Sequence, residues 1–473
     1  MDKLKNKVLK YLINNRENSI LIDSDLKINS EEILHLALEI NKKKIINKKI
    51  VINLDRSAQY IGLIFALWIN GNTVIPTNKN WPKKYIHEIR KTCNADLIFN
   101  SKIYKKLNIS ENNFTKKAFK EKVNVFKKIK LKNNIPYMIF TSGTTSKQKG
   151  VVISEKSYLD YISWTSREFH SYKNLKSLIL TSELNFDITF GDIAFALFSN
   201  CKIIIAKNNS NIFEIIQLID QFKIEVMYTV PNLFKLLFVV LKKYKINKSI
   251  KLFISGGEAL NKQICVDANK LFPNSTFYNV YGPTECTINI TSYKVKLEKL
   301  KNKKIVPIGK IFSHLYWKIL PIGNDKTVGE LIVGGSQLML GYINTEYNFL
   351  RIANGKYYNT GDLVKIEKGQ IYWLSRNDSM IKRKGLRIYT TEIDEVVENK
   401  NKDVISKTIL INGDLILFFR GTSNKKEILE SIKENLPAYM HPLKIFKIKD
   451  FPLGPTGKVD VNHLKEIYAS KKN

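Results

Sequence analysis

The sequence predicts an α/β protein with a large multi-lobed N-terminal domain and a smaller α+β C-terminal domain. The chain has 473 residues, more than one hydrophobic core usually organises, so two or more domains are expected. Short apolar runs alternate with segments of helical period along most of the chain, which is typical of largely parallel sheets whose strands are joined by helices. From about residue 375 this alternation gives way to the pattern of a compact α+β unit. We therefore expect domains at residues 1–375 and 376–473.

The first third of the chain supplies the first alternating elements. Ser30, followed by two glutamates, marks the start of a helix. Residues 102–132 are rich in lysine and asparagine, and we expect an exposed connection there. The other expected elements are strands at 49–54, 73–76 and 95–99 and helices at 58–69 and 83–93.

The same alternation continues through the middle of the chain. From 305 to 335 it is replaced by short strands with glycine turns, which predicts a small β-rich lobe. The expected strands before that lobe are 137–140, 177–181, 201–206, 225–230, 251–255 and 276–280.

The last hundred residues show a different local pattern. Residues 391–400 are a charged helical segment, and 408–419 contain two apolar runs around Asn412-Gly413, a strong hairpin signal. Asn424 and Glu427 have the spacing of a capping box before a helix at 425–435.

Composition restricts the function classes. The formal net charge is +34, but the lysines are spread along the whole chain and no nucleic-acid-binding motif appears, so we expect no nucleic-acid partner. No run approaches the roughly 20 apolar residues that span a bilayer, and the N-terminus lacks a signal peptide. We expect a cytoplasmic protein without membrane attachment. The four cysteines and six histidines show no metal-ligand spacing.

A hydroxyl-rich loop follows the strand expected at 137–140. Residues 141–150 read Thr-Ser-Gly-Thr-Thr-Ser-Lys-Gln-Lys-Gly. Hydroxyl groups, backbone N–H groups and lysines suit phosphate oxygens. The loop is not the common phosphate loop, which requires Gly-x4-Gly-Lys-Ser/Thr. A polar surface turn is the alternative, and the rest of the chain must decide between the two.

Four further segments stand in a defined order after this loop. They are Asn279-Val-Tyr-Gly-Pro-Thr-Glu285, Tyr358-Asn-Thr-Gly-Asp362, the region from Arg376-Asn-Asp378 through Lys384-Gly-Leu-Arg387 to Glu392, and Gly454-Pro-Thr-Gly-Lys-Val-Asp460. Together with the loop they resemble the AMP-forming, adenylate-forming superfamily, which includes amino-acid adenylation domains of peptide synthetases, D-alanine–carrier protein ligases, acyl-CoA synthetases and luciferases. The resemblance covers essentially the whole chain. It implies activation of a carboxylic acid by ATP, with release of pyrophosphate.

The resemblance also implies the residues that contact ATP and Mg²⁺. The loop would hold the β- and γ-phosphates, and Glu285 would bind Mg²⁺, a hard cation that prefers oxygen ligands. Asp362 would accept hydrogen bonds from the ribose hydroxyls. Lys458, Glu285 and Thr144 would be catalytic. The expected nucleotide contacts are Thr141, Ser142, Gly143, Thr144, Thr145, Lys149, Gly257, Asn279, Tyr281, Thr284, Asp362, Arg376 and Lys458.

In this family the C-terminal domain is mobile, and the resemblance carries that expectation to residues 376–473. Lys458 would bridge the substrate carboxylate and the α-phosphate and reduce the repulsion between them. Asp378 matches the hinge position, and Gly385 would line the channel for an incoming thiol. Rotation after adenylate formation would withdraw Lys458.

The segment Asn185-Phe-Asp187 indicates which acid is activated. Amino-acid-activating members of the family carry Phe-Asp here, and the aspartate pairs with the substrate α-ammonium group. The alternative is that Asp187 caps the following helix. A small-to-medium, polar, uncharged side chain would fit the implied pocket. Its lining residues are Asp187, Ile188, Gly191, Asn232, Ile254, Gly256, Val280, Ile288 and Asn289.

We therefore expect an enzyme that forms an aminoacyl-AMP and transfers the aminoacyl group to the phosphopantetheine thiol of a separate carrier protein, because no carrier segment occurs in the chain. Such carriers tend to be acidic, and the basic surface would favour the encounter. An acyl- or aryl-CoA ligase of the same superfamily is the alternative, although the histidine typical of those relatives is absent from residues 181–185. A nucleotide-binding protein without turnover is a third possibility, which the presence of Glu285, Asp362 and Lys458 disfavours.

Three positions depart from the family pattern. Ser146 replaces a loop glycine, Gln148 replaces a proline, and Asn359 replaces the arginine that usually precedes Thr-Gly-Asp. A serine at a position of positive φ would cost on the order of 1 kcal/mol.

Overall fold

The structure is a computed structural model of residues 1–473. It describes the chain except residues 82, 108–114, 142–148, 209–210, 245–247, 301–302, 323–324, 344–345, 354, 377–379, 384–385, 412–413, 437–439, 455–457 and 471–473. The side chains of residues 84, 85, 141, 376, 380–383, 386–389 and 392 are also outside the description.

The chain divides into two compact units. The first comprises Met1–Trp317 and Val333–Tyr358, and the second comprises Lys318–Ile332 and Asn359–Asn473. The expected boundary after residue 375 stays a prediction. The helices are α1 Asp2–Asn14, α2 Ser30–Lys42, α3 Ala58–Ile69, α4 Lys83–Cys93, α5 Ser101–Lys105, α6 Lys116–Lys128, α7 Glu155–Glu168, α8 Asp187–Ser199, α9 Ile212–Phe222, α10 Pro231–Leu241, α11 Lys262–Leu271, α12 Thr390–Lys400, α13 Lys425–Asn435 and α14 Val461–Ser470.

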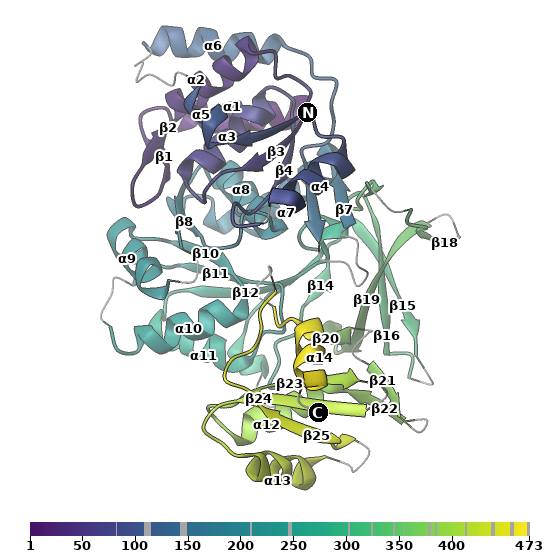
Figure 1. The fold of residues 1–473 in the computed structure, drawn as a ribbon. Coiled ribbons are helices and arrows are strands. Elements are labelled where there is room, and N and C mark those ends of the chain that lie inside the picture. Colours follow the sequence, from purple (N-terminus) through teal and green to yellow (C-terminus); the bar gives the residue numbers. More distant parts are fainter. Residues whose placement is uncertain are drawn as a thin grey trace. The chain divides into compact units, whose positions relative to one another are not determined.

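A nine-stranded sheet forms the centre of the first unit, in the order β14-β13-β12-β11-β10-β8-β9-β1-β2 (Figure 1). Strands β12, β11, β10, β8, β9 and β1 are parallel to their neighbours in this series, and the two ends are antiparallel. The alternation of helices and strands therefore predicted the sheet correctly. The strands are β1 Ser19–Ile22, β2 Lys27–Asn29, β8 Ser177–Leu180, β9 Lys202–Ile205, β10 Val226–Thr229, β11 Leu252–Ser255, β12 Thr276–Tyr281, β13 Thr291–Lys294 and β14 Lys310–Ile311.

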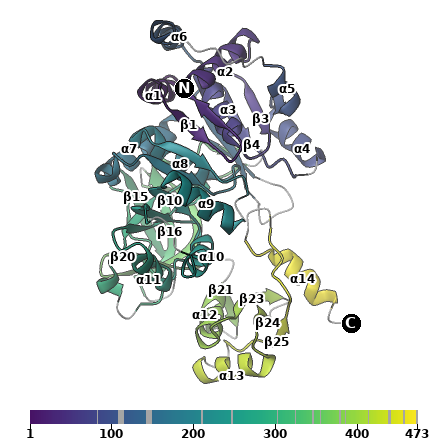
Figure 2. The same ribbon diagram turned by 90° about the vertical axis from the view of Figure 1, so that its left-hand side faces the viewer.

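A six-stranded sheet, β17-β7-β6-β4-β3-β5, lies in the same unit. Strands β3, β4, β5 and β6 pair in parallel, whereas β6, β7 and β17 pair antiparallel, so the hydroxyl-rich loop joins two antiparallel strands. Helices α1, α2 and α3 gather beside β3 and β4 (Figure 2). The strands are β3 Lys49–Asn53, β4 Thr73–Pro76, β5 Leu97–Asn100, β6 Tyr137–Thr141, β7 Lys149–Ile153 and β17 Gly341–Tyr342.

An aromatic cluster ties β6 to helix α8. The ring of Tyr137 on β6 stacks on Phe190 of α8 with a centroid distance of 3.9 Å. Tyr158 of α7 donates a hydrogen bond to the backbone oxygen of Phe190 at 2.8 Å. Trp68 of α3 packs on the rings of Tyr158 and Phe190. All four side chains are fully buried. The strand that leads into the loop and the helix that begins at Asp187 are therefore held by one core.

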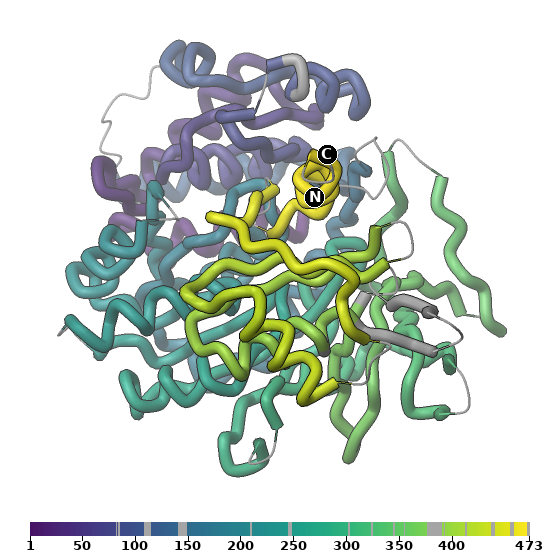
Figure 3. Tube along the Cα trace, turned by 60° about the horizontal axis from the view of Figure 1, so that its bottom comes forward, coloured from purple at the N-terminus to yellow at the C-terminus, as the bar shows by residue number. Residues whose placement is uncertain are grey.

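The remaining sheets contain the β-rich lobe and the C-terminal strands. A five-stranded sheet has the order β15-β16-β19-β18, with β20 paired to β19. In the second unit, β23 and β24 form the expected hairpin, and β25 pairs in parallel with β24. The yellow-green tube in Figure 3 traces this part of the chain. The strands are β15 Leu315–Pro321, β16 Val328–Gly335, β18 Leu350–Ile352, β19 Gly355–Glu367, β20 Gln370–Arg376, β21 Met380–Arg383, β22 Leu386–Tyr389, β23 Ile405–Ile411, β24 Asp414–Arg420 and β25 Lys444–Lys447.

Two helix starts show how accurate the local signals were. Asn424 and Glu427 form the predicted capping box of α13. At α2 the cap is Asn29 with Glu32, one residue before the expected Ser30. Among the described residues, no helix is both long and apolar enough to cross a membrane.

The expectation of an exposed connection at 102–132 was wrong. The segment contains α6, whose lysines surround Phe119, Val123 and Phe126, each about 1% exposed. These three residues have the spacing of one helical face, so α6 is an amphipathic helix. The high lysine content of the segment had suggested an exposed connection instead.

Candidate active site

The candidate site in the first unit lies where strands of the nine-stranded sheet end. Residues 181–187 follow β8, Val230 follows β10, and Gly256 follows β11. Because β8, β10, β11 and β12 are parallel neighbours, their carboxyl ends meet at one edge of the sheet. Ligand sites of open α/β sheets lie outside this edge. The predicted substrate and adenine residues come from these segments.

Asp187 is the first residue of α8 and is 9% exposed. The N-cap position belongs to Phe186, which makes no side-chain capping bond, so Asp187 does not have the N-cap place that the alternative interpretation gave it. The partial positive charge of a helix N-terminus stabilises a carboxylate at this position. Burial raises the pKa values of the Tyr161 and Tyr228 hydroxyls, and the charge of Asp187 raises them further.

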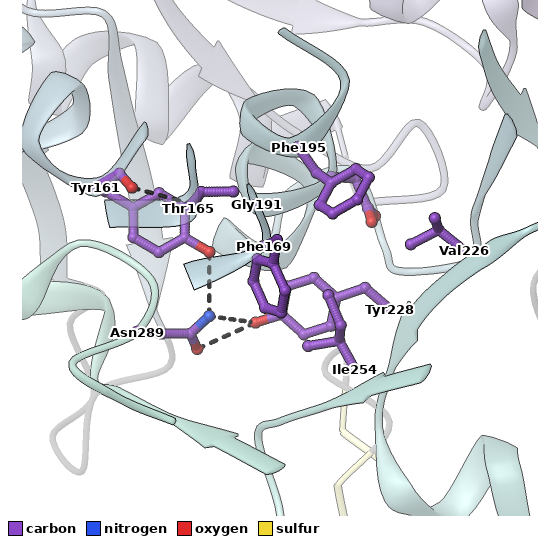
Figure 4. A pocket seen from close by; sticks show the side chains of 10 residues that line it. Tyr161, Thr165, Phe169, Gly191, Phe195, Val226, Tyr228, Ile254 and Asn289 are labelled. Carbon is purple, nitrogen blue, oxygen red and sulfur yellow. Dashed lines mark hydrogen bonds between the residues drawn. The ribbon is translucent and has the colours of Figure 1, made fainter. Parts of the chain in front are cut away.

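A small pocket lies beside Gly191 on α8 (Figure 4). Its free volume is about 10 Å³, room for about one water molecule. Asn289 donates from Nδ2 to the hydroxyls of Tyr228 at 2.8 Å and Tyr161 at 3.1 Å, and the Tyr228 hydroxyl donates to Asn289 Oδ1 at 3.0 Å. The lining residues are Tyr161, Thr165, Phe169, Gly191, Asp192, Phe195, Val226, Tyr228, Ile254 and Asn289.

A clamp, formed by the side chain of Gln337, holds the turn that carries Ile288 and Asn289. Thr287 and Ile288 have φ values of 60° and 72°, which L-residues with branched side chains rarely adopt. Gln337 is fully buried, and its amide nitrogen donates to the backbone oxygens of Cys286, Thr287 and Asn289 at 3.2, 3.3 and 2.9 Å. The hydrogen bonds of Gln337 therefore support a strained turn next to the pocket.

Asn279 provides an acceptor where the adenine amino group was expected. It is 1% exposed, and its Nδ2 donates to the backbone oxygens of Val306 at 3.3 Å and Pro307 at 2.9 Å. These bonds orient the amide, and Oδ1 has no partner among the described residues. A buried unpaired acceptor is costly, so a donor such as an exocyclic amino group fits here. Gly257 nearby has a φ of 86°, which glycine adopts without strain.

Glu285, the expected Mg²⁺ ligand, lies in a short 3₁₀ turn after β12, together with Thr284. Tyr342 donates a hydrogen bond to its Oε1 at 2.7 Å, and the Lys149 ammonium lies 5.2 Å from the Tyr342 ring centroid. No cluster of three or more acidic, histidine or cysteine side chains occurs among the described residues. A single carboxylate fits Mg²⁺ because this ion usually takes one or two carboxylates together with substrate phosphates.

Asp362 belongs to the second unit and lies on β19. It is 4% exposed, and Trp373 donates a hydrogen bond from its indole nitrogen to Asp362 Oδ1 at 3.0 Å. The backbone N–H of Asp362 donates to Thr360 Oγ1 at 3.1 Å. The Asp362 carboxylate is therefore held in one orientation. Arg376 pairs with Asp362 through the β19–β20 register, and its side chain is outside the description.

Lys458 lies on an exposed turn of the second unit. The backbone N–H of Gly454 donates to the Lys458 oxygen at 2.8 Å, and Leu453 forms an isolated bridge with Val459. Asp460 then caps α14 by accepting from the backbone of Asn462 at 2.9 Å. The turn is thus anchored at its base.

Several expected site residues lie outside the described part of the chain. They are Ser142, Gly143, Thr144 and Thr145 of the loop and the hinge residue Asp378, together with the side chain of Thr141.

The structure brings Ile188, Gly256, Val280, Ile288 and Tyr281 to the same edge of the sheet. It does not bring Asn232 into the pocket. Asn232 is exposed on α10, and the strand before it supplies Tyr228 instead.

Sequence reasoning missed most of the pocket lining, Tyr161, Tyr228 and Asp192 included, and also Gln337 and Tyr342. A tyrosine within an apolar strand or helix is typical of a packed core, so its sequence pattern carries no signal of a pocket. Gln337 lies in a polar turn after β16, where nothing in the sequence indicated burial.

Comparison with known proteins gives a consistent result. The family profile described as AMP-binding enzyme matches residues 35–343. The chain is 25% identical to bacitracin synthase 2 of Bacillus licheniformis over 92% of its own length, but spans only 18% of that protein. It is 27% identical to the D-alanine–D-alanyl carrier protein ligase of Listeria monocytogenes over 83% of both chains. The crystal structure of IdnL7 superposes with a TM-score of 0.83 at 19% identity, covering 99% of each chain.

Proposed function

The chain belongs to the AMP-binding enzymes, and from this premise we propose that it activates an α-amino acid as aminoacyl-AMP and passes it to a carrier thiol. In the first step a carboxylate oxygen bonds to the α-phosphorus of ATP and pyrophosphate leaves. In the second step a thiol sulfur bonds to the acyl carbon, AMP leaves, and the thiol loses its proton. We place both steps in the cytoplasm. The D-alanyl carrier protein ligase and the peptide synthetases among its relatives support the amino-acid substrate.

Asp187 is the observation that carries the choice of an amino acid. A buried carboxylate at the start of α8 gives an α-ammonium group the close anion that it needs in a partly dry pocket. A fatty or aryl acid has no cation to pair with it. The acyl- or aryl-CoA ligase therefore remains the less favoured alternative.

The adenine half of ATP would be recognised in the first unit. Asn279 offers an oriented acceptor, Tyr281 follows on the same strand, and Gly257 gives close access to the backbone. The phosphates would be held by the loop from Thr141 to Lys149, with Thr144 among the catalytic residues.

Glu285 would hold Mg²⁺, and Tyr342 would orient its carboxylate. When bound, the cation neutralises charge on the phosphates. Lys149 places a further positive charge beside Tyr342.

The second unit would supply the ribose contacts and the catalytic lysine. Asp362 and Arg376 would bind the ribose, and Lys458 would bridge the substrate carboxylate and the α-phosphate. An ammonium there offsets the repulsion of two anions in the transition state. Asp378 would act as the hinge of a mobile C-terminal domain.

Amino-acid-dependent ATP–pyrophosphate exchange tests the proposal. The purified protein is assayed with ATP, Mg²⁺ and a panel that contains amino acids, aryl acids and fatty acids. We expect exchange with at least one amino acid and none with the other acids. Exchange with fatty or aryl acids alone would establish the alternative, and exchange with no acid would refute activation.

Transfer is tested with a phosphopantetheinylated carrier protein and with free coenzyme A in parallel. We expect a thioester on the carrier that survives acid precipitation and is released by hydroxylamine. A thioester with coenzyme A alone would contradict the carrier-protein part of the proposal.

A further inference from the structure

Tyr228 occupies the space that two glycines leave open in the pocket. A Cβ built on Gly191 would lie 2.8 Å from Cε1 of Tyr228, and one built on Gly256 would lie 3.5 Å from the Tyr228 hydroxyl. The tyrosine ring therefore fills the gap between α8 and the end of β11. The glycines make room for Tyr228 and leave little for a ligand.

The position of Tyr228 is fixed by its partners. Its hydroxyl exchanges two hydrogen bonds with Asn289, and Asn289 also bonds to Tyr161 (Figure 4). The three side chains are between 2 and 4% exposed. Rotating Tyr228 out of the pocket would leave buried polar atoms of Asn289 unpaired, which is unfavourable.

The polar groups of the pocket are also largely engaged with each other. Both N–H groups of the Asn289 amide donate to tyrosines, and its oxygen accepts from Tyr228. The remaining walls near the glycines are apolar, formed by Ile288 and Val280. Asp192 also lines the pocket, and its Oδ2 has no hydrogen-bond partner among the described residues, so a long side chain is excluded by the lack of room rather than by a lack of partners.

We infer that Tyr228 is a size filter and that the substrate is an α-amino acid whose side chain has at most about two non-hydrogen atoms: glycine, alanine, serine or cysteine. The free volume of about 10 Å³ sets this limit. Forcing a larger side chain into a packed pocket costs about 1–3 kcal/mol, which corresponds to a loss of about 5–150-fold. The inference rests on the proposed function, because it takes the pocket beside Gly191, about one turn along α8 from Asp187, as the place of the amino-acid side chain.

The first test is the wild-type chain in the exchange assay. The panel contains glycine, both enantiomers of alanine, serine, cysteine, valine, leucine, phenylalanine, glutamate and lysine. We expect kcat/KM for at least one of the small amino acids to exceed that for leucine and phenylalanine by about 100-fold. A preference for a large side chain would overturn the inference and leave amino-acid activation intact, whereas no exchange with any amino acid would refute the proposed function itself.

The second test enlarges the pocket. Tyr228→Ala should raise the ratio of leucine to alanine kcat/KM by about 10-fold or more, because the ring that blocks the pocket is gone. Tyr228→Phe is the matched control, since it keeps the ring but removes the hydroxyl, and it should keep the size limit. A folded Tyr228→Ala variant with an unchanged ratio would overturn the inference.

Two further variants keep the test decisive if Tyr228→Ala does not fold. Tyr228→Leu retains an apolar side chain and should also raise the ratio of leucine to alanine kcat/KM. Gly191→Ala should act in the opposite direction, because its Cβ would press on Tyr228, and should lower kcat/KM for alanine more than for glycine. Equal effects of Gly191→Ala on glycine and alanine, with no gain in Tyr228→Leu, would contradict the size filter.

Discussion

The acid pocket is enclosed in the core of the first unit, whereas Lys458 lies on an exposed turn of the second. Tyr161, Tyr228 and Asn289 are hydrogen-bonded to each other before any ligand arrives. The Lys458 side chain is exposed, and among the described residues a backbone hydrogen bond joins Gly454 to Lys458. The proposed recognition pocket is thus organised by folding, while the proposed catalytic cation must lose side-chain freedom at the moment it acts.

This difference has consequences for mutation. Changes in the pocket should alter both stability and selectivity, because each side chain there supports another. Changes at Lys458 should alter the reaction rate alone. The predictions below run from the largest expected effect to the smallest.

Lys458→Met should lower the rate of adenylate formation by roughly 10²–10³-fold, because a positioned donor to the developing charge is lost. Melting temperature should not change, since the side chain is exposed. Lys465→Met, at an exposed position of α14, is the control and should retain activity. Single-turnover measurement of aminoacyl-AMP checks this, and a normal rate in Lys458→Met would remove the assigned role.

Asp187→Asn should reduce kcat/KM for the amino acid by about 10–100-fold, because a charge-assisted hydrogen bond is worth about 1.5–3 kcal/mol. The KM for ATP should change little. Asp25→Asn, which removes an exposed carboxylate paired with Lys207, is the control. If amino-acid use is unaffected, Asp187 has only a structural role at the start of α8.

Gln337→Met should destabilise the chain by about 1–3 kcal/mol, because three buried backbone oxygens lose their donor. The strained turn at Thr287 and Ile288 should also loosen and raise the KM for the amino acid. Urea unfolding followed by tryptophan fluorescence measures the first effect. Gln263→Met removes an exposed amide on α11 and should be neutral, and equal stabilities of the two variants would contradict the clamp.

Tyr342→Phe should raise the Mg²⁺ concentration required for half-maximal exchange by about 3–10-fold. The ring beneath Lys149 remains, and the hydroxyl loses its hydrogen bonds to Glu285 and Tyr358. Tyr316→Phe is the control, because its hydroxyl bonds only to the backbone of Lys356 at an exposed site. An unchanged Mg²⁺ requirement would show that Tyr342 does not position the carboxylate.

Asp192→Asn should have the smallest effect on activity. Its effect on the stability of the protein should depend on pH. Burial raises the pKa of Asp192 well above its usual range, and Arg56 offsets this only in part. The pKa of Asp192 is higher in the folded than in the unfolded state. Below about pH 4 the carboxyl is protonated in both states and does not change the free energy of unfolding. As pH rises toward the folded-state pKa, the unfolded state alone loses the proton, so the stability of the protein falls. Stability of the variant relative to the wild type should therefore increase from pH 4 to pH 8 in urea titrations. A constant difference would mean that the carboxylate is charged in the fold.

Much of the fold was predictable because it rests on local signals. The apolar run at 58–69 became α3, and the capping box at Asn424 became the start of α13. The five strands expected before the β-rich lobe of this sheet differ from those observed by a residue at their ends, whereas β1, β2 and β13 were not expected. The prediction for residues 102–132 was wrong because it relied on the high lysine content and overlooked the helical spacing of three buried apolar residues.

The candidate site residues likewise divide into those that local sequence signals predicted and those that they did not. Asn279, Glu285, Asp362 and Lys458 stand in short motifs, so their order and spacing in the sequence predicted them as site residues, and these roles stay predictions. Asn232 was expected in the pocket from the family resemblance, but Tyr228 of the preceding strand lines the pocket and Asn232 is exposed on α10.

The sequence by itself determined the family, the nucleotide motifs and the carboxylate at position 187, because motif chemistry depends on residues close together in the chain. Only the tertiary structure decided the shape of the acid pocket. Tyr161, Gly191, Tyr228 and Asn289 come from α7, α8, β10 and the turn after β12. Their mutual distances depend on how these elements pack, and the ring of Tyr228 fills the space beside Gly191 and Gly256.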